Sequence, residues 1–476
     1  MHTNFINQKI LRKLLYISLF FFAFLNFNYN FLNIAGTSNF YNTPATNTEV
    51  ETTDGILYGL KTGHYTLGRI QRGDFTPKQY RDDFRNRNDE GIYRQYTTAY
   101  GLQVKIFGHL VKNYNFNLNN LHVINSLIFS LIIILFSIFL QKNFTLFASI
   151  VFALTLSMSP WIISHAKDIR FMTWASFLPL ICVAMMNYYT NLKKIQNMLL
   201  CVFFIFFSIT FKCLFGYEYI STIMSITFFY FIFTILKLKV SKKYLFFAAT
   251  LSSTFIFFGF LLSFVFQNII IHTNKDPGID RIKQRIYSNL GLVSKSLEKN
   301  PCLNESFISI KTTIEGCKNN NNYYNKYVGL SRIEVLGRYF IFRNLLPWVG
   351  NSEKFLDEGF KSYLKRIFWN REYSNIKSIF NEFNYKSFIA ILLVVFQSCI
   401  FIIIIFLCFR KVLLKGDAAD KILLFGSFIG STSWFVLAKN YSFTHMHLCY
   451  IAWFLSFLPF ALTLLAQKKN INTKLK

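Results

Sequence analysis

The feature that most constrains this chain is a set of apolar runs of about 18 to 22 residues, the length at which a helix crosses a bilayer. The chain has 476 residues, of which 53% are hydrophobic and 58 are Phe. We therefore expect an all-α polytopic membrane protein with about ten transmembrane helices. The predicted spans are residues 14–33, 120–140, 143–159, 173–190, 198–216, 219–236, 244–268, 388–409, 421–437 and 447–466.

Short segments rich in Lys and Arg predict the orientation of these spans. With ten spans, all six such segments fall on one side of the membrane, and the positive-inside rule makes that side cytoplasmic. The segments contain Lys9, Lys142, Lys193, Lys237, Arg410 and Lys468. Both termini are then cytoplasmic. The predicted location is the inner (cytoplasmic) membrane, with the active face external or periplasmic. We interpret the net charge of +28 as this topology signal and as contact with membrane lipids, not with nucleic acid.

Two long segments then lie outside, and they divide the chain into three parts. Residues 1–268 form an N-terminal module of seven spans that includes the first external loop, residues 34–119. Residues 269–387 form the second external loop, and residues 388–476 carry the last three spans. Both external loops are expected to carry interfacial helices. The second loop also contains Cys302 and Cys317, which could pair if that compartment is oxidising.

The clearest interfacial helix is predicted within residues 96–114. Apolar side chains recur there near one helical face, and lysines stand at its margins, as in a helix that lies in the plane of the membrane surface. The apolar positions are Leu102, Ile106, Phe107, Leu110 and Val111. Residues 355–369 have a similar pattern.

The polar residues that are hardest to explain as structure fall on the predicted external side. Glu218 stands between Tyr217 and Tyr219 and between two apolar runs. A carboxylate at such a boundary is costly unless it has a partner or a task, and we favour a task over simple pairing with Lys212. Lys167 ends another span and is expected to be solvated, whereas Arg170, just before an apolar run, is a candidate functional cation.

Asp54 is the predicted catalytic residue of the first external loop. A carboxylate held at the outer membrane surface can accept a proton from an acceptor hydroxyl, which is general-base chemistry. The nearby acids Asp82, Asp83, Asp89 and Glu90 alternate with arginines, which favours a solvated, charge-balanced segment for them.

At these residues the chain resembles the GT-C-type integral membrane glycosyltransferases. The resemblance consists of a first span, a long external loop with an early acid followed by Tyr (Asp54 and Tyr58), interfacial helices, and a second large loop after the seventh span. Many members have a second acid beside the first, where this chain has Gly55; Glu218 is the candidate to replace it.

This resemblance implies transfer of a sugar from a polyprenyl-phosphate or polyprenyl-diphosphate donor to a glycan or lipid acceptor, with inversion. Asp54 and Glu218 are then the catalytic acids. The residues expected to bind the donor phosphate are Arg170, Lys439, His445 and His447. The residues expected to bind the substrates are Tyr58, Tyr93, Arg94, Gln103, Tyr217 and Tyr219. The resemblance makes no cofactor certain and leaves a divalent metal possible, and the sugar and the acceptor stay open.

Three other functions remain open from the sequence. A lipid-linked glycan transporter or flippase would place ionisable groups near mid-membrane. A polysaccharide polymerase or ligase would use Arg and His of a late external loop, for which Arg332, Arg338, Arg343 and His445 are available. A membrane acyltransferase would place a histidine deep within a span.

Overall fold

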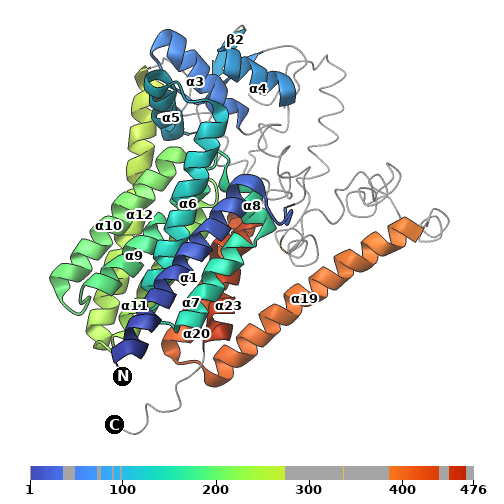
Figure 1. The fold of residues 1–476 in the computed structure, drawn as a ribbon. Coiled ribbons are helices and arrows are strands. Elements are labelled where there is room, and N and C mark those ends of the chain that lie inside the picture. The colour runs from blue at the N-terminus through green and yellow to red at the C-terminus, as the bar shows by residue number, and fades with distance from the viewer. Residues whose placement is uncertain are drawn as a thin grey trace, which may run out of the picture.

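The computed structural model describes residues 2–35, 49–71, 77–87, 91–96, 99–273, 336, 385–438 and 450–467. Over these residues the chain is predominantly helical. Figure 1 shows long helices side by side in a bundle, with the shorter elements α3, α4, α5 and β2 gathered at one end, which we call the α3 end. The predicted helical membrane architecture is therefore confirmed in its coarse form.

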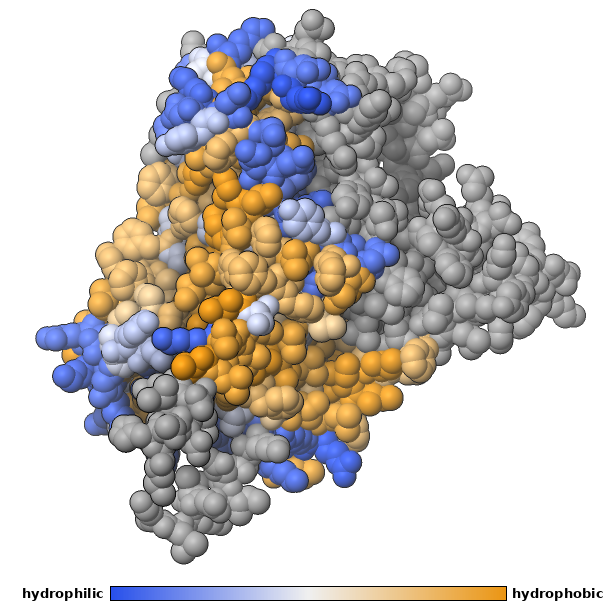
Figure 2. Space-filling view, in the orientation of Figure 1, coloured by the Kyte–Doolittle hydropathy of each residue, from blue (hydrophilic) through white to orange (hydrophobic). Residues whose placement is uncertain are grey.

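Five helices are long and apolar enough to cross a bilayer. They are α1 (His2–Tyr29), α6 (Leu118–Leu140), α10 (Ile195–Phe215), α11 (Ile220–Lys237) and α12 (Lys242–Thr273). A sixth is obtained if α7 (Leu146–Ser157) and α8 (Pro160–Ala166), which meet at a 64° bend, form one broken span. Figure 2 shows the matching surface: an apolar belt around the middle and hydrophilic residues toward both ends.

The predicted number of ten spans is not confirmed within the described residues. The remaining predicted spans also fall on helices, none of which is among these candidate spans within the described residues. They are η2 (Thr173–Phe177) with α9 (Leu178–Tyr189), α19 (Tyr385–Lys415), α20 (Ala418–Leu437), and η5 (Trp453–Phe457) with α23 (Leu458–Ala466).

The break between α7 and α8 follows from local sequence. The Ser159 side chain accepts a hydrogen bond from the backbone N–H of Ile162 at 3.1 Å and so caps a new helix, and Pro160 occupies its first turn. Proline cannot donate to the preceding turn, so one continuous helix is not possible here. The chain turns, and the segment after α8 is directed into the protein interior.

Close approach of α11 and α20 depends on a small residue. A Cβ atom at Gly426 of α20 would lie 2.1 Å from the Phe229 ring of α11. The pair packs along much of its length, and α10 packs on α12 in the same way. Small residues at such contacts bring helix backbones together where lipid offers no hydrophobic drive for association.

The α3 end contains one feature that the sequence did not predict. Between α3 (Val50–Thr62) and α5 (Leu102–Tyr114), the strands β1 (Gly68–Gln71) and β2 (Ile92–Gln95) form an antiparallel pair, and α4 (Pro77–Asn86) lies between them in sequence. The segment that leads into β1 runs close to α3, since a Cβ atom at Gly55 would lie 2.1 Å from the Thr66 carbonyl oxygen. The all-α prediction therefore misses a small hairpin that packs on α3.

A helix, α5, is present within residues 96–114, and its position at the membrane interface stays a prediction. Gly101, with φ of 73°, precedes the helix, and the buried side chains include Val104, Phe107 and Val111. Ile106, on the predicted apolar face, is exposed on the surface of the protein. The helix predicted at residues 355–369 and the cysteines at 302 and 317 lie outside the described residues.

Several basic helix ends lie at the end of the bundle opposite α3. Figure 1 places the start of α1 and the α11–α12 and α19–α20 junctions there. The clustering agrees with the predicted charge asymmetry, and which side faces the cytoplasm stays a prediction.

Candidate functional site at the α3 end

The segment that follows α8 brings three charged residues into the protein interior. Lys167, Asp168 and Arg170 are all buried, and Arg170 is only 4% exposed. The expectation that Lys167 is solvated at a span end is therefore wrong. Buried charges need partners, and the partners come from α3, α6 and the α10–α11 turn.

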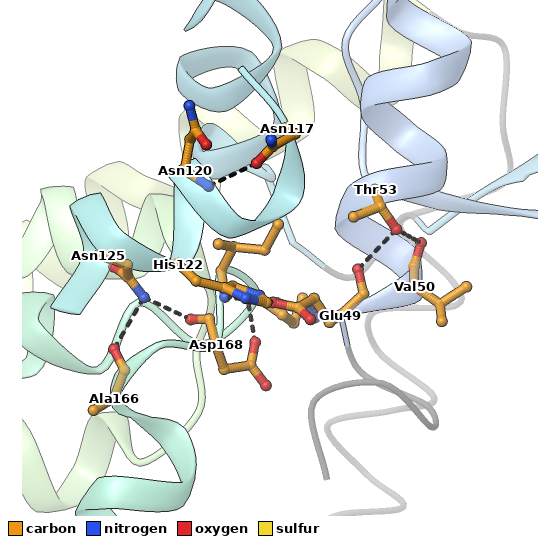
Figure 3. A network of polar contacts seen from close by, with 11 residues as sticks. Glu49, Val50, Thr53, Asn117, Asn120, His122, Asn125, Ala166 and Asp168 are labelled. Atoms are coloured by element: carbon orange, nitrogen blue, oxygen red, sulfur yellow. Dashed lines mark hydrogen bonds and ion pairs between the residues drawn. The ribbon is translucent and has the colours of Figure 1, made fainter. Parts of the chain in front are cut away.

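Asn125 of α6 holds the backbone of this segment in place. Its Nδ2 atom donates to the carbonyl oxygens of Ala166 (3.1 Å) and Asp168 (2.9 Å), and its Oδ1 accepts from Trp174 Nε1 (2.6 Å). Figure 3 shows the amide directed at the two carbonyls. One fully buried side chain thus fixes the segment that carries Arg170.

Arg170 lies between two glutamates from distant parts of the chain. Its Nε atom is 3.2 Å from Glu51 Oε2 and its Nη2 atom is 3.3 Å from Glu218 Oε1. The Tyr96 ring lies 5.6 Å from the guanidinium, within the range of a cation–π contact. Burial alone would lower the pKa of Arg170, but Glu218 and Glu51 together raise it above its usual value. The guanidinium is therefore a fixed cation.

The sequence-predicted acid Glu218 thus has a structural partner. Lys212, considered as its alternative partner, donates instead to the Gly216 carbonyl oxygen at 2.8 Å. The left-handed backbone of Tyr219 (φ 60°) turns the chain between α10 and α11 and presents Glu218 to Arg170. Glu218 keeps 18% of its side chain exposed, so the site is not sealed around it.

Tyr217 and Tyr219 flank Glu218 but pack away from Arg170. The Tyr217 ring stacks on Phe264 at 4.9 Å, and its hydroxyl accepts from Ser263 at 3.1 Å. The Tyr219 ring lies 5.1 Å from Trp434. Both tyrosines anchor the α10–α11 turn to neighbouring helices, which gives them a structural task beside the predicted substrate contact.

The start of α3 supplies two acids that the sequence analysis did not select. Glu51 binds Arg170, and Glu49 Oε1 accepts from His122 Nε2 (2.7 Å) and from the backbone N–H of Ile169 (3.2 Å). Burial alone would raise the pKa of Glu49, but the His122 contact, the Ile169 N–H and the charge of Lys167 hold it below its usual value. Ile169 and Arg170, which are consecutive in the segment after α8, are thus held by Glu49 and Glu51 at the start of α3.

Asp54 lies one helix turn beyond Glu51, on the same face of α3. It is 1% exposed, and its Oδ2 atom accepts from the backbone N–H of Ile70 at 2.9 Å. This contact ties β1 to α3. Whether Asp54 also accepts a proton during a reaction stays a prediction.

The predicted substrate tyrosines Tyr58 and Tyr93 stack face to face, with ring centroids 3.9 Å apart. The Tyr93 hydroxyl donates to the Thr66 carbonyl oxygen at 2.7 Å. Burial raises the pKa of Tyr93, and the nearby Asp54, Tyr58 and Glu51 raise it further. The carboxylates of Asp54 and Glu51 therefore both lie close enough to Tyr93 to act on its hydroxyl.

The remaining predicted site residues divide into two groups. The Gln103 Nε2 atom donates to the Arg170 carbonyl oxygen at 3.1 Å, so Gln103 belongs to the site. The backbone of Arg94 pairs with Arg69 in the hairpin, and its side chain is outside the description. Lys439, His445 and His447 also lie outside the described residues.

An Asp54→Ala protein is expected to lose about 1–3 kcal/mol of its free energy of unfolding, because the buried Ile70 N–H loses its acceptor. Asp54→Asn is the matched control, since its amide oxygen can still accept that bond. Thermal unfolding of the detergent-solubilised protein measures both. Equal destabilisation by Ala and Asn would contradict the assigned contact.

The described residues contain no group of three or more His, Cys, Asp or Glu side chains placed to hold a metal ion. Comparisons of the chain with protein-family models, curated proteins and solved structures find no match. The fold and the buried charges define a helical membrane protein with a polar site at the α3 end, and its chemistry has to be argued from these side chains.

Proposed function

We propose that this chain is a membrane glycosyltransferase. It takes a sugar from a polyprenyl-phosphate or polyprenyl-diphosphate donor and transfers it, with inversion, to a hydroxyl of a glycan or lipid acceptor. The reaction takes place at the outer face of the cytoplasmic membrane. The observation that carries the proposal is Arg170, a buried guanidinium held between Glu51 at the start of α3 and Glu218 between α10 and α11.

A guanidinium suits the leaving group of this reaction. When the bond between the anomeric carbon and the phosphate oxygen breaks, negative charge develops on the lipid phosphate, and a fixed cation lowers the energy of that state. Arg presents a planar set of donors that matches phosphate oxygens. Gln103, through the Arg170 carbonyl oxygen, and Asn125, through that of Asp168, keep the segment in position before any substrate arrives.

The two glutamates on Arg170 give the site a way to accept a phosphate. A donor phosphate competes with Glu51 and Glu218 for the guanidinium, and a carboxylate that it displaces is then available for a sugar hydroxyl. Both glutamates are 18% exposed, so exchange does not require the bundle to open. Lys439, His445 and His447 remain candidates for binding the donor phosphate, and Arg94 remains a candidate for binding substrate.

The location of the site fits a lipid-linked donor. A polyprenyl chain lies in the hydrocarbon core, and its phosphate lies at the membrane surface. The charged residues of the site occur where apolar helices end, not at their centres, which disfavours the transporter alternative. The polymerase or ligase alternative uses the same donors and differs in the acceptor.

Proteoliposomes that contain the purified protein and a radiolabelled polyprenyl-linked sugar test the proposal. A membrane extract added to the proteoliposomes supplies the acceptor, and we expect label to pass from the polyprenyl lipid to a water-soluble or lipid molecule of that extract. We expect Arg170→Ala to abolish this transfer. Tyr188→Phe, far along α9 from the site, is the control for handling losses. Movement of intact donor across the bilayer without transfer would refute the glycosyltransferase and support a flippase.

A further inference from the structure

Glu49 and His122 form a carboxylate–imidazole pair beside Arg170. His122 lies in the second turn of α6, and its Nε2 atom is 2.7 Å from Glu49 Oε1. Glu49 is 1% exposed, whereas His122 keeps 14% of its side chain exposed. Glu49 also accepts from Ile169, whose neighbour is Arg170, so the pair and the guanidinium are held by the same short segment.

The contact fixes the tautomer of the imidazole. An ionised carboxylate only accepts hydrogen bonds, so the proton of neutral His122 is on Nε2, and Nδ1 carries a lone pair. Among the described residues, no hydrogen bond to His122 Nδ1 is made. A base oriented by a buried acid, with its other nitrogen available, is the arrangement that activates hydroxyl groups in many enzymes.

The acids nearby are less suited to take a proton. Glu51 and Glu218 are already engaged by the Arg170 guanidinium. Asp54 is buried and accepts from Ile70, and Asp168 is buried and accepts from the Arg170 N–H at 2.7 Å. His122 combines partial exposure with a lone pair that no described group uses.

We propose that His122 is the proton acceptor for the attacking hydroxyl, with Glu49 as its positioning residue; this inference rests on the proposed function. The acceptor oxygen forms a bond to the anomeric carbon while the bond from that carbon to the phosphate oxygen breaks. The hydroxyl proton moves to Nδ1, and the electron pair leaves with the phosphate toward Arg170. Glu49 balances the charge of the resulting imidazolium.

The decisive variant is His122→Gln. Its side-chain amide can still donate to Glu49, so the fold is kept, but it offers no basic nitrogen. We expect kcat for sugar transfer to fall by about 10²-fold or more, with KM for the donor little changed and the unfolding temperature near that of the wild type. His109→Gln, the same substitution at an exposed position of α5 outside the site, is assayed beside it and is expected to retain full activity.

Glu49→Gln tests the positioning role separately. It leaves the imidazole in place but removes the negative charge, and we expect an intermediate loss of kcat. In protein with ¹⁵N-labelled histidine, NMR should assign the proton of neutral His122 to Nε2, and Glu49→Gln should shift that signal. A proton on Nδ1 would overturn the inference without any activity measurement.

The failures are distinguishable. Wild-type protein that transfers no sugar from any polyprenyl-linked donor would overturn the proposed function and this inference together. If the wild type is active and His122→Gln stays within about threefold of it, only the inference falls, because a general base contributes far more than that. Loss of activity in Asp54→Asn with retention in His122→Gln would move the base to Asp54.

Discussion

An Arg170→Ala protein is expected to lose about 3–5 kcal/mol of its free energy of unfolding, as well as sugar transfer. The physical reason is that Glu51 and Glu218 would remain in a mostly buried site with their shared cation gone. Removing one partner of a buried ion pair costs more than the pair contributes, because the charge left behind has neither water nor a partner.

Two matched variants separate charge from geometry at this position. Arg170→Lys keeps a cation but replaces the planar fork with a single ammonium, so it is expected to bridge the two glutamates poorly and to show intermediate stability. A protein that combines Arg170→Met with Glu51→Gln and Glu218→Gln removes the guanidinium together with both carboxylates that bind it, so stability should largely return while transfer does not.

The measurement is thermal unfolding in detergent micelles, followed by intrinsic fluorescence, together with the transfer assay. Recovery of stability without activity in the triple variant would assign Arg170 a task beyond holding the glutamates. An Arg170→Ala protein with the wild-type unfolding temperature would contradict the buried ion-pair geometry. Stable but inactive Arg170→Lys would point to phosphate recognition by the guanidinium fork.

The sequence predicted helices well because the signal for them is local. A run of apolar residues long enough to cross a bilayer specifies a helix whatever its neighbours do, since an unpaired backbone is too costly in lipid. The α6, α10, α11 and α12 helices therefore lie close to their predicted ranges. The number of spans was less predictable, because it depends on bends such as the one at Pro160.

The site could be predicted only in part, because its contacts join residues distant in sequence. Glu218 and Arg170 were selected for their exceptional positions beside apolar runs, and the structure brings them together. Glu49 and Glu51 were not selected, because nothing near them in sequence indicated His122 or Arg170 as partners. A local signal did exist, because two acids, Glu49 and Glu51, lie within the five residues before Asp54.

The wrong prediction for Lys167 and the missed pair of strands also arise because the deciding contacts join residues distant in sequence. Lys167 at the end of a span ordinarily reaches water, but the turn after α8 directs it inward, where the carboxylate of Glu49 is close enough to stabilise its charge. The hairpin of β1 and β2 was missed because its strands are four residues long and their pairing depends on the turn of α3 that carries Asp54.

Asn125→Ala is expected to destabilise the protein by about 3 kcal/mol or more, although Asn125 touches no predicted substrate group. The substitution leaves two carbonyl oxygens and one indole N–H without partners in a fully buried place, and each costs about 1–3 kcal/mol. Because the carbonyls belong to Ala166 and Asp168, the segment that carries Arg170 loses its anchor. Transfer should fall even at temperatures where the bundle stays folded.

Two further variants identify which bond matters. Asn125→Asp keeps an acceptor for Trp174 but places a carboxylate against two carbonyl oxygens, so it should be at least as damaging as Ala. Trp174→Phe removes only the indole donor, and a double-mutant cycle with Asn125→Ala should give a coupling energy of about 0.5–3 kcal/mol. Additive effects would mean that the Asn125–Trp174 bond of 2.6 Å contributes nothing. In that case the two carbonyl contacts alone would connect α6 to the guanidinium.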